Sequence, residues 1–324
     1  MSTTTNSNKF GFLNDSSVAA FISVCTLIIL FGYILYDKSS TSATDAISDE
    51  GVLEEGYENL PQPLPAISFE VPEKISFAGE PVPLHIPDVR ERLDKELQIN
   101  CYLHSNTIFL IKRANRWLPQ MEEILKRYDI PEDFKYLPLI ESNLLNVTSP
   151  RNAVGYWQIL KESGKEFGLE ITNEVDERYD PLKATEAACK YLRKAYQKFG
   201  NWALVAASYN RGRGGIDRAL DDQQVDSYYD LYLNDETSRY VFRILAIKEI
   251  VENPSRYGFK IDSKHLYPQE SLRFVEVSET IKDLVVFAKA QGTNYKLLKR
   301  HNPWLREDRL TIKKGARYRI ALPE

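Results

Sequence analysis

Cysteine and histidine are scarce in this chain of 324 residues, and their positions argue against two classes of enzyme. The three cysteines (Cys25, Cys101 and Cys189) lie far apart, and neither they nor the four histidines show the spacing of a metal site. The sequence therefore disfavours a metalloenzyme or a cysteine nucleophile, and we expect no metal and no cofactor. With so few cysteines, the fold must rest on a hydrophobic core.

The chain also lacks an excess of positive charge. Its 42 Lys and Arg residues face 46 Asp and Glu residues, which gives a formal net charge of -4. Nucleic-acid-binding proteins usually concentrate basic residues on one face, so we expect no nucleic-acid partner. A hydrophobic content of 43% and a charged content of 27% are typical of a globular protein with one large domain and a smaller one.

An uncharged apolar run, VAAFISVCTLIILFGYILY, occupies residues 18–36, behind a short head of residues 1–17. It matches the ~20 residues that a helix needs to cross ~30 Å of hydrocarbon. A cleavable signal peptide has a shorter apolar core of ~7–15 residues. We therefore predict a transmembrane anchor with the bulk of the chain exported. The alternative is cleavage that leaves a secreted or a lipid-anchored protein, although Val24 stands where a lipoprotein site before Cys25 needs a small residue.

Residues 37–87 are rich in serine, aspartate and proline, and seven of the 16 prolines lie between Pro61 and Pro87. Prolines at this density block regular helix and favour extended chain. We predict a flexible tether here.

A helical period dominates from residue 88 to residue 262. Asp180 and Pro181 begin one helix that Gly200 ends, and Asn201 caps the next. No alternating strand pattern appears, so we predict a mainly α-helical domain at 88–262. The tail, residues 272–324, reads as strand, helix, helix and strand, which predicts a small α+β module.

The segment YLPLIES, residues 136–142, places Glu141 among apolar neighbours. A buried carboxyl group loses hydration in its charged form, so its pKa rises toward neutral. A general acid that must hold its proton near pH 7 needs this property. The alternative interpretation is a solvated glutamate at a helix end.

The segment AVGYWQI, residues 153–159, places Gly155 where the backbone can approach a ligand and Gln158 where an amide can bind one. The alternative is a packed Trp157 beside a surface glutamine. In ALVAASYNRG, residues 203–212, Tyr209 and Asn210 stand at the end of an apolar helix, where they can bind a sugar or merely end the helix.

The segment DETSRYV, residues 235–241, puts Glu236 and Tyr240 four residues apart on one helical face. We expect Tyr240 to reach either the acid or the substrate. The alternative is that it only packs.

In this order, the four segments resemble the catalytic domain of the lytic murein transglycosylases, most closely the membrane-bound D type. The resemblance implies a goose-lysozyme-like helical fold that cleaves the β-1,4 bond between N-acetylmuramic acid and N-acetylglucosamine in peptidoglycan. It also implies that Glu141 is the single catalytic acid and base. The residues expected to bind substrate are Ser142, Gly155, Gln158, Tyr209, Asn210, Glu236 and Tyr240.

The tail resembles a LysM module through Gly292, Leu298, the pair Asn302 and Pro303, Leu310 and Gly315. This resemblance implies binding to glycans that contain N-acetylglucosamine, with Asn302 and Pro303 in the glycan-binding module. The alternative is a docked structural appendage.

One carboxylate suffices in the mechanism that the resemblance implies, because the substrate's own 6-hydroxyl attacks and forms a 1,6-anhydro product during cell-wall turnover or remodelling. A rival is a muramidase on the same fold that uses Asp176, Glu177 or Asp180 as a second acid. Another is a non-catalytic peptidoglycan-binding scaffold. The expected location is the bacterial inner membrane, with the catalytic domain in the periplasm. Expected partners are peptidoglycan glycan strands, the membrane and other cell-wall enzymes.

Overall fold

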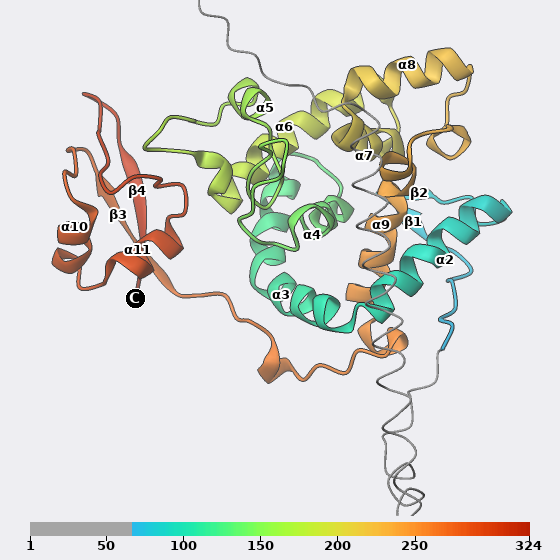
Figure 1. The fold of residues 1–324 in the computed structure, drawn as a ribbon, viewed down its shortest axis with the longest axis horizontal. Helices are drawn as coiled ribbons and strands as arrows, with labels where there is room; N and C mark the ends of the chain where they lie inside the picture. Colours follow the sequence, from blue (N-terminus) through green and yellow to red (C-terminus); the bar gives the residue numbers. More distant parts are fainter. Residues whose placement is uncertain (1–66) are drawn as a thin grey trace, which may run out of the picture. The chain divides into compact units, whose positions relative to one another are not determined.

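The computed structural model describes residues 67–324, which form a helical domain followed by a small C-terminal module (Figure 1). The expected head, the expected transmembrane anchor and residues 37–66 of the expected tether lie outside the described residues. No helix within 67–324 is both long enough and apolar enough to span a bilayer.

The helical domain contains eight α-helices and five short 3-10 helices within the described residues, after a two-stranded hairpin. The hairpin pairs β1 with β2 in antiparallel fashion. In chain order the elements are β1 (Ser76–Phe77), β2 (Glu80–Pro81), α2 (Pro87–Tyr102), α3 (His104–Arg127), η1 (Glu132–Tyr136), α4 (Leu137–Ser142), α5 (Lys161–Glu166), η2 (Glu177–Tyr179), α6 (Pro181–Phe199), α7 (Trp202–Arg211), α8 (Arg213–Gln223), η3 (Tyr228–Asp230), α9 (Asp235–Glu252), η4 (Pro254–Tyr257) and η5 (Ser263–His265).

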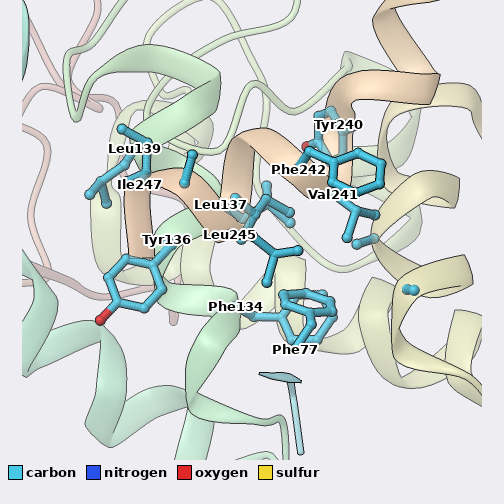
Figure 2. Packing of buried hydrophobic residues seen from close by; sticks show 14 of the residues in the cluster. Phe77, Phe134, Tyr136, Leu137, Leu139, Tyr240, Val241, Phe242, Leu245 and Ile247 are labelled. Atoms are coloured by element: carbon cyan, nitrogen blue, oxygen red, sulfur yellow. The ribbon is translucent and has the colours of Figure 1, made fainter. Parts of the chain in front are cut away.

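Helix α9 runs through the middle of this domain and packs against α2, α4 and α7. Its apolar residues are not confined to one stripe, because neighbours surround the helix on several sides. Figure 2 shows Tyr240, Val241, Phe242 and Leu245 of α9 in the core beside residues of η1 and α4. The core thus fixes α4 and α9 against each other.

Local signals set the ends of α6 and α7, as the sequence predicted. The carboxylate of Asp180 accepts hydrogen bonds from the backbone N–H groups of Leu182 and Lys183, at 2.9 and 3.1 Å. Gly200 ends α6 with a φ of 60°, a left-handed conformation that glycine adopts without strain. Asn201 then caps α7 by accepting from the N–H of Leu204 at 3.0 Å.

The expectation of a flexible tether up to residue 87 is wrong for its described part. Phe77 is 1% exposed and contacts Phe134 with the ring centroids 5.2 Å apart (Figure 2). The carboxylate of Glu80 accepts from the backbone N–H of Trp202 at 2.9 Å. Proline prevents helix but leaves extended chain free to pack, and a fully buried apolar side chain such as Phe77 contributes about 1.5–3 kcal/mol. The segment from Val71 to Leu84 is therefore part of the folded domain.

The C-terminal module has the order strand, helix, helix and strand that the sequence predicted. Its elements are β3 (Leu272–Val277), α10 (Leu284–Ala290), α11 (Tyr295–His301) and β4 (Tyr318–Pro323). The two strands pair in antiparallel register, with Leu272 opposite Pro323 and Val277 opposite Tyr318. They build a hydrophobic core separate from that of the helical domain.

Candidate active site

Glu141 lies near the end of the short helix α4, where two cavities meet. Leu137 and Leu139 on the same helix are fully buried, so the core anchors α4 and leaves Glu141 at the surface of the cleft. The helix ends at Asn143, which takes a left-handed φ of 53°. The cavities have volumes of about 410 and about 590 Å³, and Glu141 and Glu236 line both of them.

The surroundings of the Glu141 carboxyl group favour its protonated form. Burial raises the pKa of Glu141 to about 7, and the negative charge of Glu236 adds to this rise. A hydrogen bond from the hydroxyl of Tyr240 and the positive charge of Arg243 both act in the opposite direction on the pKa of Glu141. The result is a carboxyl group able to hold or release a proton near neutral pH.

Tyr240 acts on the acid and not on the cavity. It is 1% exposed, and its hydroxyl donates to Oε1 of Glu141. We expected Tyr240 to reach either the acid or the substrate, and in the structure it contacts the acid. Burial keeps the pKa of the Tyr240 hydroxyl well above its usual value, so the group remains a neutral donor.

Tyr209 and Asn210, at the end of α7, both line the 410 Å³ cavity. The hydroxyl of Tyr209 donates to the carbonyl of Trp157 at 2.7 Å, which leaves the ring as an apolar wall. The amide of Asn210 donates to Glu236 at 3.0 Å and accepts from the hydroxyl of Thr237 at 2.8 Å. These contacts fix the orientation of the Asn210 amide beside Glu236.

The wall loop, which we define as residues 146–160, forms another side of the same cavity. Its backbone folds back on itself, with Val154 bridged to both Thr148 and Ile159. The Gln158 side chain donates to the carbonyls of Val147 and Gly155, at 3.1 and 2.8 Å. No residue within 67–324 donates to the amide oxygen of Gln158, so that oxygen is available to a ligand.

Three residues of the motifs serve the packing around the cavity. Gly155 has a φ of +80°, and a Cβ there would lie 2.1 Å from the carbonyl oxygen of Arg178, so its close approach is to the protein backbone and not to a ligand. Ser142 is buried, with its hydroxyl 2.8 Å from the carbonyl of Tyr156. Trp157 has no exposed surface, and its indole N–H donates to the hydroxyl of Thr185 at 2.8 Å. Trp157 is therefore packed, as the alternative interpretation expected, whereas Gln158 lines the cavity and is not a surface glutamine.

Two separate stretches of the chain match known domain families. Residues 120–231 match the transglycosylase SLT domain, and residues 273–324 match the C-terminal LysM-like domain of soluble lytic transglycosylases. The chain carries an SLT domain followed by a LysM-like domain. Glu141, Gln158, Tyr209 and Asn210 all lie inside the SLT match.

Curated relatives agree with these domains. The membrane-bound lytic murein transglycosylase D of Escherichia coli strain K12 is 31% identical over 195 residues, which is 57% of this chain and 42% of that protein. The same protein of Escherichia coli O6:H1 gives the same values. The match thus spans less than half of the length of these relatives.

Solved structures give weaker likenesses. The 70 kDa soluble lytic transglycosylase of Escherichia coli is 17% identical, covers 55% of this chain and 33% of its own, and has a TM-score of 0.37. An inactive mutant of the lytic transglycosylase Slt from Pseudomonas aeruginosa is 18% identical, covers 58% of this chain and 36% of its own, and has a TM-score of 0.35.

Within the SLT domain, the three acids expected to serve a rival mechanism are engaged elsewhere. Asp176 binds Arg178 at 2.7 Å, Glu177 binds Lys183, and Asp180 caps α6. None of the three lines either cavity. Glu236 is the other carboxylate present in both cavities.

The sequence interpretation missed two arginines near the site. Arg243 lines the larger cavity and donates to the carbonyl of Ile140 at 2.8 Å. Its spacing of three residues from Tyr240 places it on the same helical face, a signal that the sequence did contain. The buried Arg178 binds the wall loop from outside the four motifs, and no local pattern pointed to it.

In the LysM-like domain, Asn302 is 1% exposed and its amide is used internally. It donates to the carbonyl of Ala321 at 2.6 Å and accepts from the N–H of the same residue at 2.7 Å. Asn302 therefore joins α11 to β4, and its side chain does not face a ligand. Pro303 is partly exposed. No group of three His, Cys, Asp or Glu side chains within 67–324 is placed to hold a metal ion.

Proposed function

We propose that this protein is a peptidoglycan lytic transglycosylase. It cleaves the β-1,4 bond between N-acetylmuramic acid and N-acetylglucosamine without water and leaves 1,6-anhydro ends, in cell-wall turnover or remodelling. The observation that carries the proposal is Glu141, an acid with a pKa raised to about 7 at the junction of two cavities in an SLT domain. The matched relatives are named as lytic murein transglycosylases, which supports the same activity.

In the first step, Glu141 donates its proton to the glycosidic oxygen as the bond from that oxygen to the anomeric carbon breaks. The departing N-acetylglucosamine leaves with a neutral 4-hydroxyl. The 2-acetamido group of the muramoyl sugar stabilises the positive charge that develops on the anomeric carbon. Glu141 becomes a carboxylate, which the Tyr240 hydroxyl stabilises by its hydrogen bond.

In the second step, the Glu141 carboxylate takes the proton of the muramoyl 6-hydroxyl. The 6-oxygen then forms a bond to the anomeric carbon and closes the 1,6-anhydro ring. Glu141 regains its proton, so the enzyme returns to its starting state and no water is consumed. The apolar ring of Tyr209 and the free amide oxygen of Gln158 orient the sugar in the cavity.

A hydrolytic muramidase is the second candidate, because Glu236 provides another carboxylate in the same cavities. A hydrolase that inverts the anomeric centre needs a second carboxylate to activate water. Glu236 is exposed, and Asn210 holds its carboxylate in a fixed orientation. The transglycosylase needs only Glu141.

Mass spectrometry of digested sacculi tests the proposal. Purified protein is incubated with sacculi, and the released fragments are separated and weighed. Fragments that end in 1,6-anhydro-N-acetylmuramic acid support the transglycosylase. Reducing N-acetylmuramic acid ends, heavier by one water, identify a muramidase, whereas no release by either mechanism identifies a binding scaffold. Glu141→Gln is the matched control for contaminating enzymes.

We also propose that residues 18–36 anchor the protein in the bacterial inner membrane, with the SLT domain in the periplasm and the LysM-like domain on glycan strands. The apolar run of residues 18–36 and the name of the matched relatives support this location. Fractionation tests it: the full chain is expected with inner membranes, and the protein is expected to become soluble when residues 1–40 are removed. Recovery of a shortened chain, without its N-terminal segment, in the soluble periplasm would point to cleavage instead.

A further inference from the structure

Residues 170–179, which we call the docking segment, belong to the helical domain in sequence and contact the C-terminal module. Val175 belongs to the helical domain in sequence, yet it is 2% exposed and packs in the core of the module. Its backbone forms an antiparallel bridge with Leu305. Beside the bridge, the N–H of Asp176 donates to the carbonyl of Trp304 at 2.9 Å. The module therefore incorporates a piece of the helical domain into its own structure.

Charged hydrogen bonds surround this apolar contact. The carboxylate of Glu174 accepts from the guanidinium of Arg309 at 2.8 Å and from the backbone N–H of Thr311 at 2.7 Å. These donors, the Thr311 N–H above all, lower the pKa of Glu174 and keep it charged. The hydroxyl of Tyr318 donates to Glu170 at 3.0 Å. The docking segment is thus held by specific polar contacts as well as by burial.

The opposite side of the docking segment holds the wall loop. The buried guanidinium of Arg178 donates to the carbonyls of Asn152 and Ile159, at 3.2 Å each. Asp176 fixes this guanidinium through two contacts of 2.9 and 2.7 Å. The carbonyl of Arg178 also occupies the space that a side chain at position 155 would need. Arg178 therefore contacts the wall loop at three points.

Tyr179 makes a second connection between the module and the wall loop. The guanidinium of Arg306, in the module, lies 3.7 Å from the centre of its ring. On the other side, the carbonyl of Tyr179 accepts from Asn146 at 3.0 Å, and its hydroxyl lies 3.1 Å from that of Thr148. One aromatic side chain is therefore in contact with both parts.

We propose that the C-terminal module is a clamp that holds the cavity wall in place through the docking segment, with Arg178 and Tyr179 as positioning residues. The wall loop carries Gln158 and six further residues that line the 410 Å³ cavity. The module is then a fixed component of the site and not an arm that moves independently of it. The consequence for catalysis rests on the proposed function, whereas the consequence for the order of the wall loop does not.

Hydrogen–deuterium exchange of the full-length protein, followed by peptide mass spectrometry, tests the clamp without any assay of activity. Glu174→Ala combined with Tyr318→Phe removes the docking contacts that the carboxylates of Glu174 and Glu170 accept, and leaves the wall loop itself unchanged. Hydrogen bonds to charged groups stabilise the docked state, so we expect their loss to raise the rate of amide exchange about tenfold. The rise is expected both in peptides of 304–311 and in peptides of 146–160. Glu186→Ala, which removes an exposed ion pair with Arg127 on the same domain, is the matched control.

Arg178→Lys separates the two halves of the connection. Lysine keeps the charge but loses the planar fork that reaches Asp176 and the wall loop together. We expect exchange in 146–160 to rise about tenfold while exchange in 304–311 stays as in the wild type. Circular dichroism of each variant confirms that the helical content is retained.

In the activity assay on sacculi, we expect the docking variant to raise KM about tenfold with a smaller change in kcat, because Glu141 and Tyr240 are unaffected. Faster exchange at 304–311 with unchanged exchange at 146–160 would overturn the clamp, since docking would then be independent of the cavity wall. Unchanged exchange in both segments would overturn the docking contact itself. A wild type that cleaves nothing refutes the proposed function alone, because the exchange results stand without it.

Discussion

The cleft and the docking segment both contain carboxylates in poorly solvated positions, but they compensate the charge differently. In the docking segment, Asp176 and Glu177 are 7% and 8% exposed, and each binds a cation, Arg178 or Lys183. In the cleft, Glu141 receives a hydrogen bond from the neutral hydroxyl of Tyr240.

The nearest charges do not neutralise Glu141. Arg243 donates to the carbonyl of Ile140, and Glu236 adds a charge of the same sign. Burial alone is therefore a poor marker of a functional acid, since structural acids are buried with their cations. What distinguishes Glu141 is that it is buried at a cavity and forms no ion pair with any residue of 67–324.

The largest expected difference between the two regions is in catalysis. Glu141→Gln removes the proton donor with little change in shape, and we expect glycan cleavage to fall about a hundredfold to ten-thousandfold. Glu177→Gln, a matched change outside both cavities, should leave the rate within about threefold. Release of anhydro fragments from sacculi measures both variants. Equal losses in the two variants would remove the distinction between the acids.

The next difference is in stability. Asp176→Asn leaves the buried guanidinium of Arg178 without its counter-charge, and an unpaired buried charge costs about 3–5 kcal/mol. We expect the free energy of unfolding at pH 7 to fall by about 3 kcal/mol in denaturant titrations. A change below about 0.5 kcal/mol would mean that solvent compensates Arg178 and that the pair is not a buried one.

Burial of Glu141 should make the folded state less stable as the pH rises. Because burial raises the pKa of Glu141 to about 7 in the folded state, above the ordinary glutamate value of 4.5, the folded protein holds a proton that the unfolded chain releases. The stabilisation from this proton is complete below pH 4.5 and is lost as the pH rises through about 7. Glu141→Gln has no such loss, so it should be more stable than the wild type by about 2–3 kcal/mol at pH 8.

Thermal unfolding of both proteins between pH 4.5 and pH 8.5 checks this result. The difference between them should grow with pH and level off above pH 8. A difference that does not depend on pH would show that Glu141 is as well solvated as an ordinary surface glutamate.

The sequence was sufficient to predict what local chemistry controls. Asp180, Gly200 and Asn201 set helix ends through contacts with their own neighbours, so their roles could be inferred from the residue types. The helix ends therefore require only contacts within a few residues. The apolar neighbours of Glu141 in the chain predicted a raised pKa, but Tyr240, Arg243 and Glu236, about a hundred positions away, also act on it.

Long-range packing was not predictable in the same way. The proline-rich segment suggested a tether, but Phe77 fills a space beside Phe134, more than fifty positions away. Val175 packs in a core that is otherwise built from residues of the C-terminal module. Asn302 matched a glycan-binding pattern and instead holds α11 to β4. In each case the partner is distant in sequence, so no local pattern could identify it.

The smallest expected effect concerns the charges around Glu141. Glu236→Gln keeps the size of the side chain and its contact with Asn210 but removes a charge that raises the pKa of Glu141. The alkaline limb of the kcat/KM profile should therefore move to lower pH, with activity at pH 8 reduced about twofold.

Tyr240→Phe removes a hydrogen bond that lowers the pKa of Glu141, so it should move the limb to higher pH. Shifts in the same direction would mean that the two groups do not act on Glu141 through its charge. If Glu236→Gln reduced activity at every pH as much as Glu141→Gln does, Glu236 would instead be the second carboxylate of a muramidase.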